Sequence, residues 1–180
     1  MHRSNILETL SQYSSIYPGE QETVQRFREF VQAVPNCFER SHEPGHITGS
    51  AFVLSPDRSA VLLGLHAKLN RWIQLGGHAD GCSSVEEVAM QEAVEESGIE
   101  KLKFYPSPLP IDLDIHRIPE HRNVKEHLHY DVRFLLHSEE KDFVCSDESL
   151  ALKWVPLDSF TDYCQEPAVL RAMEKIIRCL

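Results

Sequence analysis

Residues 77–99 read GHADGCSSVEEVAMQEAVEESGI and form the most informative segment of the chain. A glycine-bearing loop leads into a helix that we predict for residues 84–97. Ser83 or Ser84 can serve as its N-cap, and acidic residues follow at once, where they suit the positive end of the helix dipole. Gly98 is placed to stop the helix, because glycine readily adopts the left-handed conformation of a C-terminal cap. The stretch therefore predicts a loop that is held against the start of one helix.

Three glutamates form the chemical signal within this predicted helix. Glu92, Glu95 and Glu96 are at i, i+3 and i+4, so their side chains share one face, and we expect Met90 and Val94 opposite them to face the core. Clustered carboxylates repel one another, and a divalent cation would offset that repulsion. Hard oxygen ligands suit Mg²⁺, with Mn²⁺ as the alternative. A solvated acidic face is the competing interpretation, and the flanking glycines favour the metal site.

Outward from this segment, helical and extended patterns follow one another along the chain. Residues 4–34 read as two helices separated by Pro18-Gly19, and the apolar stripe of the second helix leaves room for a homodimer. The predicted strands cover residues 50–54, 60–65, 72–75, 111–116, 129–136 and 152–155, and a last helix covers 167–178. This order predicts an α+β fold with a mixed central sheet between helical layers.

Length and composition predict one globular unit. The 180 residues contain no linker or repeat, so we expect an N-terminal helical extension over residues 1–45, packed on a domain of residues 46–180. No apolar run is long enough to span a bilayer, and the start of the chain is unlike a signal peptide, so we expect a cytoplasmic protein with free thiols. A net charge of −10 argues against non-specific binding to nucleic acid or acidic membranes.

The segment from Gly77 to Ile99 resembles the Nudix box, G-x5-E-x7-R-E-U-x-E-E-x-G-U, where U is aliphatic. Glu92, Glu95 and Glu96 stand at matching positions, and so do Ala93, Gly98 and Ile99. Flanking segments are also similar, so that the resemblance covers roughly residues 49–160. It implies a Nudix-type α/β/α sandwich, and a pyrophosphohydrolase that uses Mg²⁺ to cleave a diphosphate-linked substrate by attack of water on a phosphorus.

Two positions depart from the pattern of the box. Ser83 stands where the family has its first glutamate, and Gln91 stands where it has an arginine. In the family these two residues pair to brace the loop against the helix. Because both are neutral here, neither is left as an unpaired charge. A hydrogen bond between Ser83 and Gln91 is our hypothesis for the replacement, and the departures bear on activity more than on metal binding.

The resemblance also assigns roles. It implies Glu95 and Glu96 as metal ligands, while Glu92 either joins them or activates the attacking water. In some members of the family a loop glutamate is the general base, and that role would fall here to Glu148. The alternative interpretation is that Glu148 is an ordinary surface acid. The backbone of Gly77, or of the glycine before it, is a further metal ligand by the same resemblance.

Substrate-side candidates come from the loop and from a later strand. His78 directly follows the two glycines, and we expect this position to place it beside the phosphates, with Gln74 as a further substrate-side candidate. His127, His129 and Asp131 alternate in a predicted strand and project to one face, where imidazole hydrogen bonds or partial positive charge would contact phosphate. Ordinary hydrogen-bonded strand histidines are an equally open interpretation, and a second metal site is the less favoured one.

Two functions remain open, and a third that the same fold supports, isomerisation of an isoprenoid diphosphate, is disfavoured because we cannot match the cysteine and the histidine-rich metal site on which it relies in the family. The first is metal-dependent hydrolysis of a nucleoside-diphosphate-linked or related small molecule. The alternative is a Nudix-like domain that binds nucleotide with weak or no catalysis, which the changes at Ser83 and Gln91 keep in play. The sequence identifies neither the substrate nor the oligomeric state.

Overall fold

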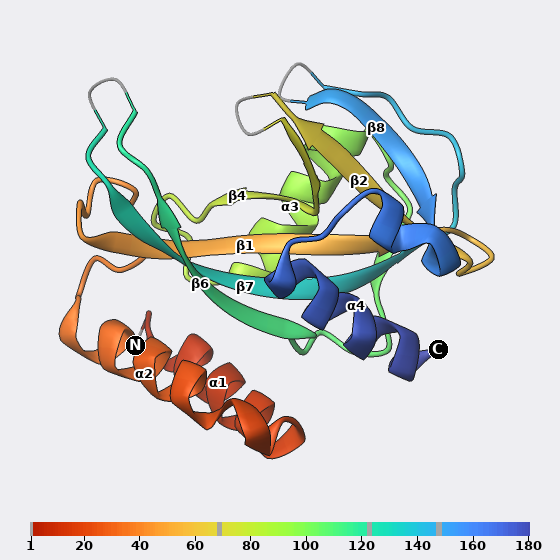
Figure 1. Ribbon diagram of the computed structural model, residues 1–180. Coiled ribbons are helices and arrows are strands. Elements are labelled where there is room, and N and C mark those ends of the chain that lie inside the picture. Colours follow the sequence, from red (N-terminus) through yellow and green to blue (C-terminus); the bar gives the residue numbers. More distant parts are fainter. Residues whose placement is uncertain (1, 68–69, 122–123, 147–148) are drawn as a thin grey trace.

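A mixed sheet of eight strands lies between helical layers (Figure 1). The computed structural model describes residues 2–67, 70–121, 124–146 and 149–180, with only the backbone of Ser15. In chain order the elements are α1 (Ser4–Ile16), η1 (Pro18–Glu20), α2 (Gln21–Ala33), β1 (Gly45–Leu54), β2 (Ala60–His66), β3 (Arg71–Ile73), β4 (Leu75–His78), α3 (Val85–Ser97), β5 (Leu102–Phe104), β6 (Asp112–Ile118), β7 (His127–Ser138), β8 (Ser149–Pro156), η2 (Leu157–Asp162) and α4 (Pro167–Cys179).

The long strands β1 and β7 form the centre of the sheet. They pair in parallel over the whole of β1, in a register that runs from Gly45↔Leu128 to Leu54↔His137. The outer edge of β1 is divided between β4, which pairs with its middle, and β2, which pairs with its end. The outer edge of β7 is divided in the same way between β6 and β5. The sheet therefore branches at both edges around one parallel pair.

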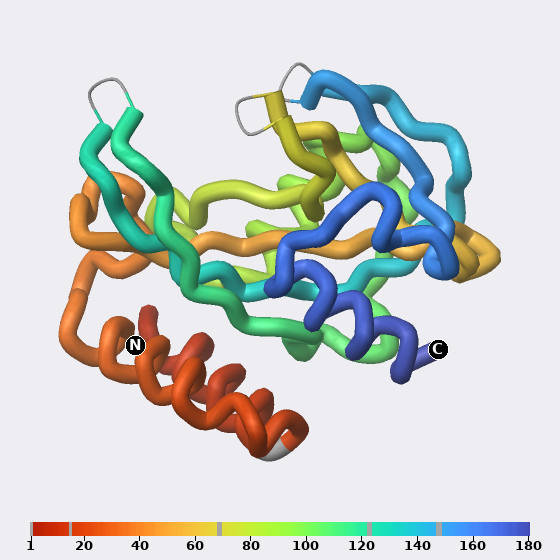
Figure 2. Tube along the Cα trace, in the orientation of Figure 1, coloured from red at the N-terminus to blue at the C-terminus, as the bar shows by residue number. Residues whose placement is uncertain are grey.

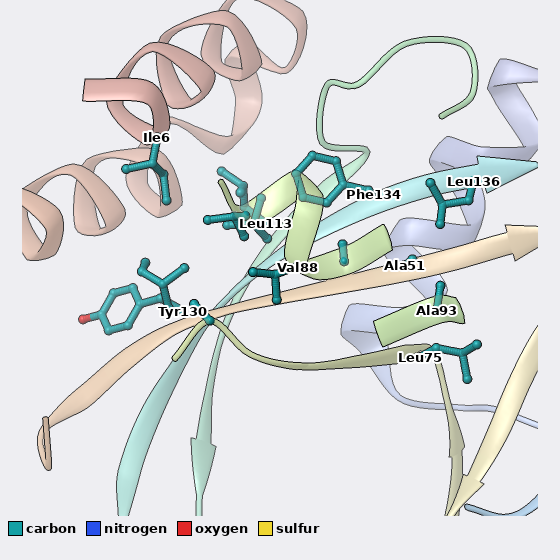
Figure 3. Close-up of a cluster of buried hydrophobic side chains, with 14 of the residues drawn as sticks. Ile6, Ala51, Leu75, Val88, Ala93, Leu113, Tyr130, Phe134 and Leu136 are labelled. Atoms are coloured by element: carbon teal, nitrogen blue, oxygen red, sulfur yellow. The ribbon is translucent and has the colours of Figure 1, made fainter. Parts of the chain in front are cut away.

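Alternate residues of β1 supply two separate cores. Ala51 and Val53 belong to the larger cluster, with residues of α1, α2 and α3, whereas Phe52 and Leu54 belong to a second cluster with residues of α4 and η2. Figure 3 shows part of the larger cluster, where Val88 and Ala93 of α3 lie among side chains of the sheet. Because helices cover both faces, the predicted α+β sandwich with a mixed sheet is confirmed.

The face that α3 turns to the sheet differs from our prediction. Val85, Val88, Ala89 and Ala93 are buried, whereas Met90 and Val94 are only partly buried. The reason is the closeness of the contact: a Cβ added at Gly49 of β1 would lie 2.8 Å from the carbonyl oxygen of Val85 and 3.2 Å from the backbone nitrogen of Ala89. Such an approach requires small side chains on the helix. Glu92 and Glu96 continue this inner stripe and so point at the sheet, while Glu95 is exposed.

The N-terminal helices pack on the end of β7. Tyr130 lies parallel to the ring of Phe30, with ring centroids 3.9 Å apart, and makes an edge contact with Phe27 at 5.3 Å. Val24, Phe27 and Val31, the apolar stripe of α2, are buried within the chain. The stripe on which we based a homodimer is thus already covered, and the dimer stays a prediction without that support. The division into residues 1–45 and 46–180 also stays a prediction.

Most predicted elements are confirmed, with shifted ends. The helix predicted for residues 84–97 begins one residue later, and Gly98 caps it in the left-handed conformation with a φ of 67°. Strand β1 begins at Gly45 rather than at residue 50, and the two residues Gly77 and His78, expected in a loop, lie in β4. Strand β5 was not predicted. Among the described helices, none has both the length and the apolar character needed to cross a membrane.

A buried lysine joins the last helix, α4, to the first helix, α1, drawn in dark blue and in red in Figure 2. Lys175 of α4 donates to the hydroxyl of Tyr13 in α1 at 2.8 Å and to Asp112 of β6 at 2.6 Å. It also pairs with Glu20 at 2.5 Å. Lys175 is 8% exposed and Asp112 is fully buried, so solvent cannot replace these contacts.

We predict that Lys175→Met destabilises the protein by about 2–4 kcal/mol, because it leaves a buried carboxylate short of one partner. Urea denaturation measures the change. Arg178→Met on the same helix is the control, since its pairing with Glu174 is long at 4.0 Å and exposed to solvent. Equal losses in the two variants would show that the buried lysine does not anchor the N-terminal helices.

Candidate active site

The inner stripe of α3 meets the backbone of β4 at two successive glycines. The amide of Gly76 donates a hydrogen bond to Glu96 Oε1 at 2.8 Å. The next glycine lies against Glu92, so that a Cβ added at Gly77 would be 2.2 Å from Glu92 Oε1 and 2.5 Å from its Cδ. A side chain at position 77 would collide with the Glu92 carboxylate, and one at position 76 would collide with Ser50 and Gly49 of β1. The glycines therefore allow two carboxylates to reach the strand backbone.

A cleft with a volume of about 870 Å³ opens in front of these residues. Its walls come from α3, β1, β4, β6 and β7, and they include polar groups of both signs. Among the lining residues are Glu92, Glu95, Gln74, Gly77, His78 and His129, all of which the sequence singled out. Glu96 lines a smaller adjoining cavity together with Gln74 and Gly76. The cleft is within the size range of sites for small organic ligands.

One predicted residue, His127, is not part of the cleft wall. His127 is 8% exposed and contacts His129 from within the sheet, but it does not line the cleft. Glu148 lies outside the described residues, so its assignment as a general base stays a prediction. The hypothesis of a Ser83–Gln91 hydrogen bond is wrong, because Gln91 Nε2 donates instead to Glu95 Oε1 at 2.7 Å, one turn further along α3.

Asp131 lines the cleft, but its carboxylate is occupied by hydrogen bonds within the protein. It is 3% exposed and accepts from Thr48 and Ser50 of β1, each at 3.0 Å, and from Arg133 Nε at 2.8 Å. Gln74 adds a fourth hydrogen bond at 3.2 Å. The expectation that Asp131 shares one face with His129 is confirmed, but its carboxylate binds the central strands together. Gln74 is held at the cleft by the same carboxylate.

Burial keeps two histidines near the cleft neutral. Burial, with the neighbouring His78 and His127, lowers the pKa of His46 to about 4. Burial also lowers the pKa of His129 to about 2, with contributions from His116 and His46. Both rings are therefore uncharged at neutral pH. His129 can act as a hydrogen-bonding group toward a ligand, but the partial positive charge that we considered for it is wrong.

Arg40 is a cleft residue that the sequence analysis missed. It lies in the segment between α2 and β1, lines the cleft, and forms a two-pronged ion pair with Asp80, the residue two positions after His78. The pair connects the N-terminal segment to the loop before α3. A lone arginine in an irregular segment carries no periodic signal, so only the three-dimensional arrangement reveals it.

The donor set around α3 suits a hard divalent cation. Glu92 and Glu95 line the cleft, Glu96 lies just behind it, and all the candidate donors are carboxylate or backbone oxygens. Among the described residues, the ligand atoms of His46, His127 and His129 lie within 4.8 Å of one another, whereas the carboxylates of α3 form no group as close as this. A cation with several water ligands, such as Mg²⁺, tolerates that spacing.

Comparison with solved structures gives the fold a name. The chain is similar to a NUDIX-family hydrolase from Clostridium perfringens, with a TM-score of 0.60, 22% identity, and coverage of 75% of this chain and 98% of that one. It is also similar to the dihydroneopterin triphosphate pyrophosphohydrolase of E. coli, with a TM-score of 0.57, 18% identity, and coverage of 73% and 95%.

A third similar structure is the NUDIX domain of Shewanella oneidensis NrtR complexed with ADP ribose, with a TM-score of 0.55, 16% identity, and coverage of 73% and 86%. No protein-family model and no curated protein sequence matches the chain. The structural likeness confirms the Nudix fold that the residues 77–99 predicted.

We predict that alanine is tolerated differently at the two glycines of β4. At Gly76 its Cβ would lie 2.6 Å from the Cα of Ser50 and 2.7 Å from the carbonyl oxygen of Gly49, so β1 and β4 must separate. Gly76→Ala should therefore destabilise the protein by about 1–3 kcal/mol. Gly77→Ala should destabilise it less, because the obstacle is the end of the Glu92 side chain, which can swing away.

Guanidinium denaturation measures both changes, and Gly19→Ala is the control because nothing lies within 4 Å of its added Cβ. If Gly77→Ala lost as much stability as Gly76→Ala, the carboxylate of Glu92 would be fixed rather than displaceable, against this description of the site.

Proposed function

We propose that this protein is a Nudix pyrophosphohydrolase, which hydrolyses a nucleoside-diphosphate-linked or related small molecule by attack of water on a phosphorus. One observation carries the proposal: the inner stripe of α3 brings Glu92 and Glu96 against Gly77 and Gly76 beside a cleft of about 870 Å³. The sequence motif and the site geometry lead independently to the same residues. The similar solved structures support the proposal through their shared fold.

Because the protein and its cleft are acidic, binding of an anionic diphosphate requires a cation between the two. The chain carries a net charge of −10, and acidic side chains line the cleft, whereas the substrate class is anionic. Glu95 and Glu96 would hold Mg²⁺, with Mn²⁺ as the alternative, and the backbone of Gly77 would assist them. When bound, such an ion neutralises charge on the bridging oxygens and makes water nucleophilic near neutral pH.

The residues of the chain have separate tasks in this proposal. The hydrogen bond from the Gly76 amide to Oε1 orients the Glu96 carboxylate at the edge of the cleft. Glu92, at the cleft wall, either joins the ligands or accepts the proton of the attacking water, a role for which Glu148 is the competing candidate. Gln74, His78 and His129 face the substrate, and His127 supports His129 from behind.

The cleft favours a substrate of nucleotide size. The similar E. coli structure is that of a dihydroneopterin triphosphate pyrophosphohydrolase, and the Shewanella domain was solved in complex with ADP ribose. We infer a small diphosphate of this general class as the partner, handled in the cytoplasm. The exposed acids of the cleft disfavour non-specific contact with nucleic acid, whose continuous backbone charge would be repelled.

We predict metal-dependent turnover that depends on the glutamates of α3. Product release from a panel of nucleotide sugars, dinucleoside polyphosphates and coenzyme diphosphates is measured with and without Mg²⁺ or Mn²⁺. Glu92→Gln, Glu95→Gln and Glu96→Gln should each lower kcat by about 10²-fold or more. Gly77→Ala should do the same through displacement of Glu92. Glu87→Gln, an identical change at an exposed position of the same helix, is the matched control and should leave kcat unchanged.

The same panel separates the hydrolase from a binding domain. If the folded protein bound a nucleotide in a thermal-shift assay but released no product with any metal, the non-catalytic alternative would replace the proposal. Turnover that survived all three glutamine substitutions would place the catalytic centre elsewhere.

We also predict that His78→Ala raises KM about tenfold with little change in kcat, because one hydrogen bond to a charged phosphate is lost in both ground and transition states. His137→Ala on β7 is the control, since His137 contacts the carbonyl oxygen of Pro56 away from the cleft. An unchanged KM for His78→Ala would remove this histidine from the substrate site.

A further inference from the structure

Histidines from four strands gather at one end of the sheet. His46 of β1 is directly in register with His129 of β7. His127 lies two residues before His129, on the same face of β7. The ring centroid of His46 lies 4.9 Å from that of His129 and 5.0 Å from that of His127. His78 of β4 lies 5.0 Å from His46, and His116 of β6 lies 5.4 Å from His129.

The ring of His46 is buried without a hydrogen bond from a described residue to either nitrogen. It is 2% exposed, and neither of its ring nitrogens has a hydrogen-bond partner in the described part of the chain. A buried polar group without a partner destabilises the folded state by about 1–3 kcal/mol. Ordinary strand histidines would be hydrogen-bonded, as His127 is. The unpartnered ring lies in a cluster of imidazoles. This arrangement indicates that the cluster binds an ion that accepts the lone pairs of imidazole nitrogens.

The nitrogens of three of these rings are spaced for one metal ion. Ligand atoms of His46, His127 and His129 all lie within 4.8 Å of one another. The two Nε2 atoms of His127 and His129 are 3.3 Å apart. Nitrogens bound tetrahedrally to zinc at about 2.0–2.1 Å are themselves about 3.3–3.4 Å apart. Small side-chain rotations would bring the third ring to the same ion.

A hydrogen bond holds one of the three rings, that of His127, in an orientation suited to metal binding. His127 Nδ1 donates to the carbonyl oxygen of Lys125 at 2.8 Å, which leaves its Nε2 lone pair facing the cluster. The neighbouring His116 makes a similar contact through Nδ1 with Asp114 at 3.0 Å. Hydrogen bonds of this kind from the second ring nitrogen are the usual support of metal-binding histidines.

We propose that His46, His127 and His129 bind one divalent transition-metal ion of the zinc class, at a site separate from the glutamates of α3. Imidazole nitrogens suit Zn²⁺, Ni²⁺ or Cu²⁺, whereas the carboxylates of α3 suit Mg²⁺ and Mn²⁺. His129 and His78 line the cleft as well, so the ion lies at its inner wall, where a phosphate oxygen can complete its coordination. The site does not depend on the proposed hydrolase activity.

Zinc binding to the full chain tests this proposal. After treatment with EDTA and dialysis, Zn²⁺ is titrated by calorimetry and the retained metal is counted by mass spectrometry. We expect one Zn²⁺ per chain, with a Kd that rises by more than about 100-fold in His127→Gln and in His129→Gln. His137→Gln, the same substitution on the same strand, and Glu96→Gln should leave the Kd unchanged.

Circular dichroism confirms that each variant is folded, and X-ray absorption at the zinc edge of the unmodified protein provides a measurement that needs no variant. A first shell with imidazole nitrogens at about 2.0–2.1 Å supports the site. A shell of oxygens only, zinc binding lost in Glu96→Gln but kept in the histidine variants, or no binding at all would overturn it. Hydrolytic activity plays no part in these readouts, so the two proposals succeed or fail separately.

Discussion

The distance between α3 and the sheet is the constraint on which the rest of the structure depends. The helix lies directly on the backbone of β1, with Gly49 under Val85 and Ala89. A larger residue at Gly49 would push the helix outward, and the glutamates further along the same stripe would move with it. Because Glu92 and Glu96 continue the buried stripe, the packing that forms the core also carries two carboxylates to the glycines of β4. The packing of α3 on the sheet therefore stabilises the fold and also positions the two carboxylates of the site.

A second constraint acts from within the sheet, through ionised groups beneath the cleft. Asp131 accepts four hydrogen bonds, and Arg133, which is 3% exposed, reaches Asp131, Asp112 and Asp114. Burial alone would raise the pKa of Asp114, but its hydrogen bond to His116 and the charge of Arg133 lower it instead. Removing one member of such a network leaves a charge without its partner. We infer that it fixes the register of β6 and β7, and with it the positions of Gln74 and His129.

The sequence predicted those features that local patterns encode. The period of 3.6 residues and Gly98 located α3, and alternation located most strands, including the projection of His127, His129 and Asp131 to one face. The core face of α3 was predicted incorrectly, because large apolar residues were taken as the buried ones. At a contact this close, Ala89 and Ala93 are the residues that fit, while Met90 packs against the core only partly buried and Val94 is half-buried.

His46 and Arg40 could not be found from local patterns. His46 acquires its meaning from the parallel register of β1 with β7, which places it beside His129 across 83 positions of sequence. Parallel strands are joined through long connections, and the chain between these two contains most of the domain, so no short-range signal reports their pairing. The polar alternation of His46, Thr48 and Ser50 in an otherwise buried strand was the one available sign.

The central claim is that water attacks a phosphorus beside the acidic stripe of α3. The most direct measurement is turnover of the diphosphate panel in ¹⁸O-labelled water with Mg²⁺ or Mn²⁺ present, with the products analysed by mass spectrometry. We expect one ¹⁸O atom in a single phosphoryl product, and no labelled product when the metal is omitted. Recovery of the whole panel intact and unlabelled from folded, metal-saturated protein would contradict it.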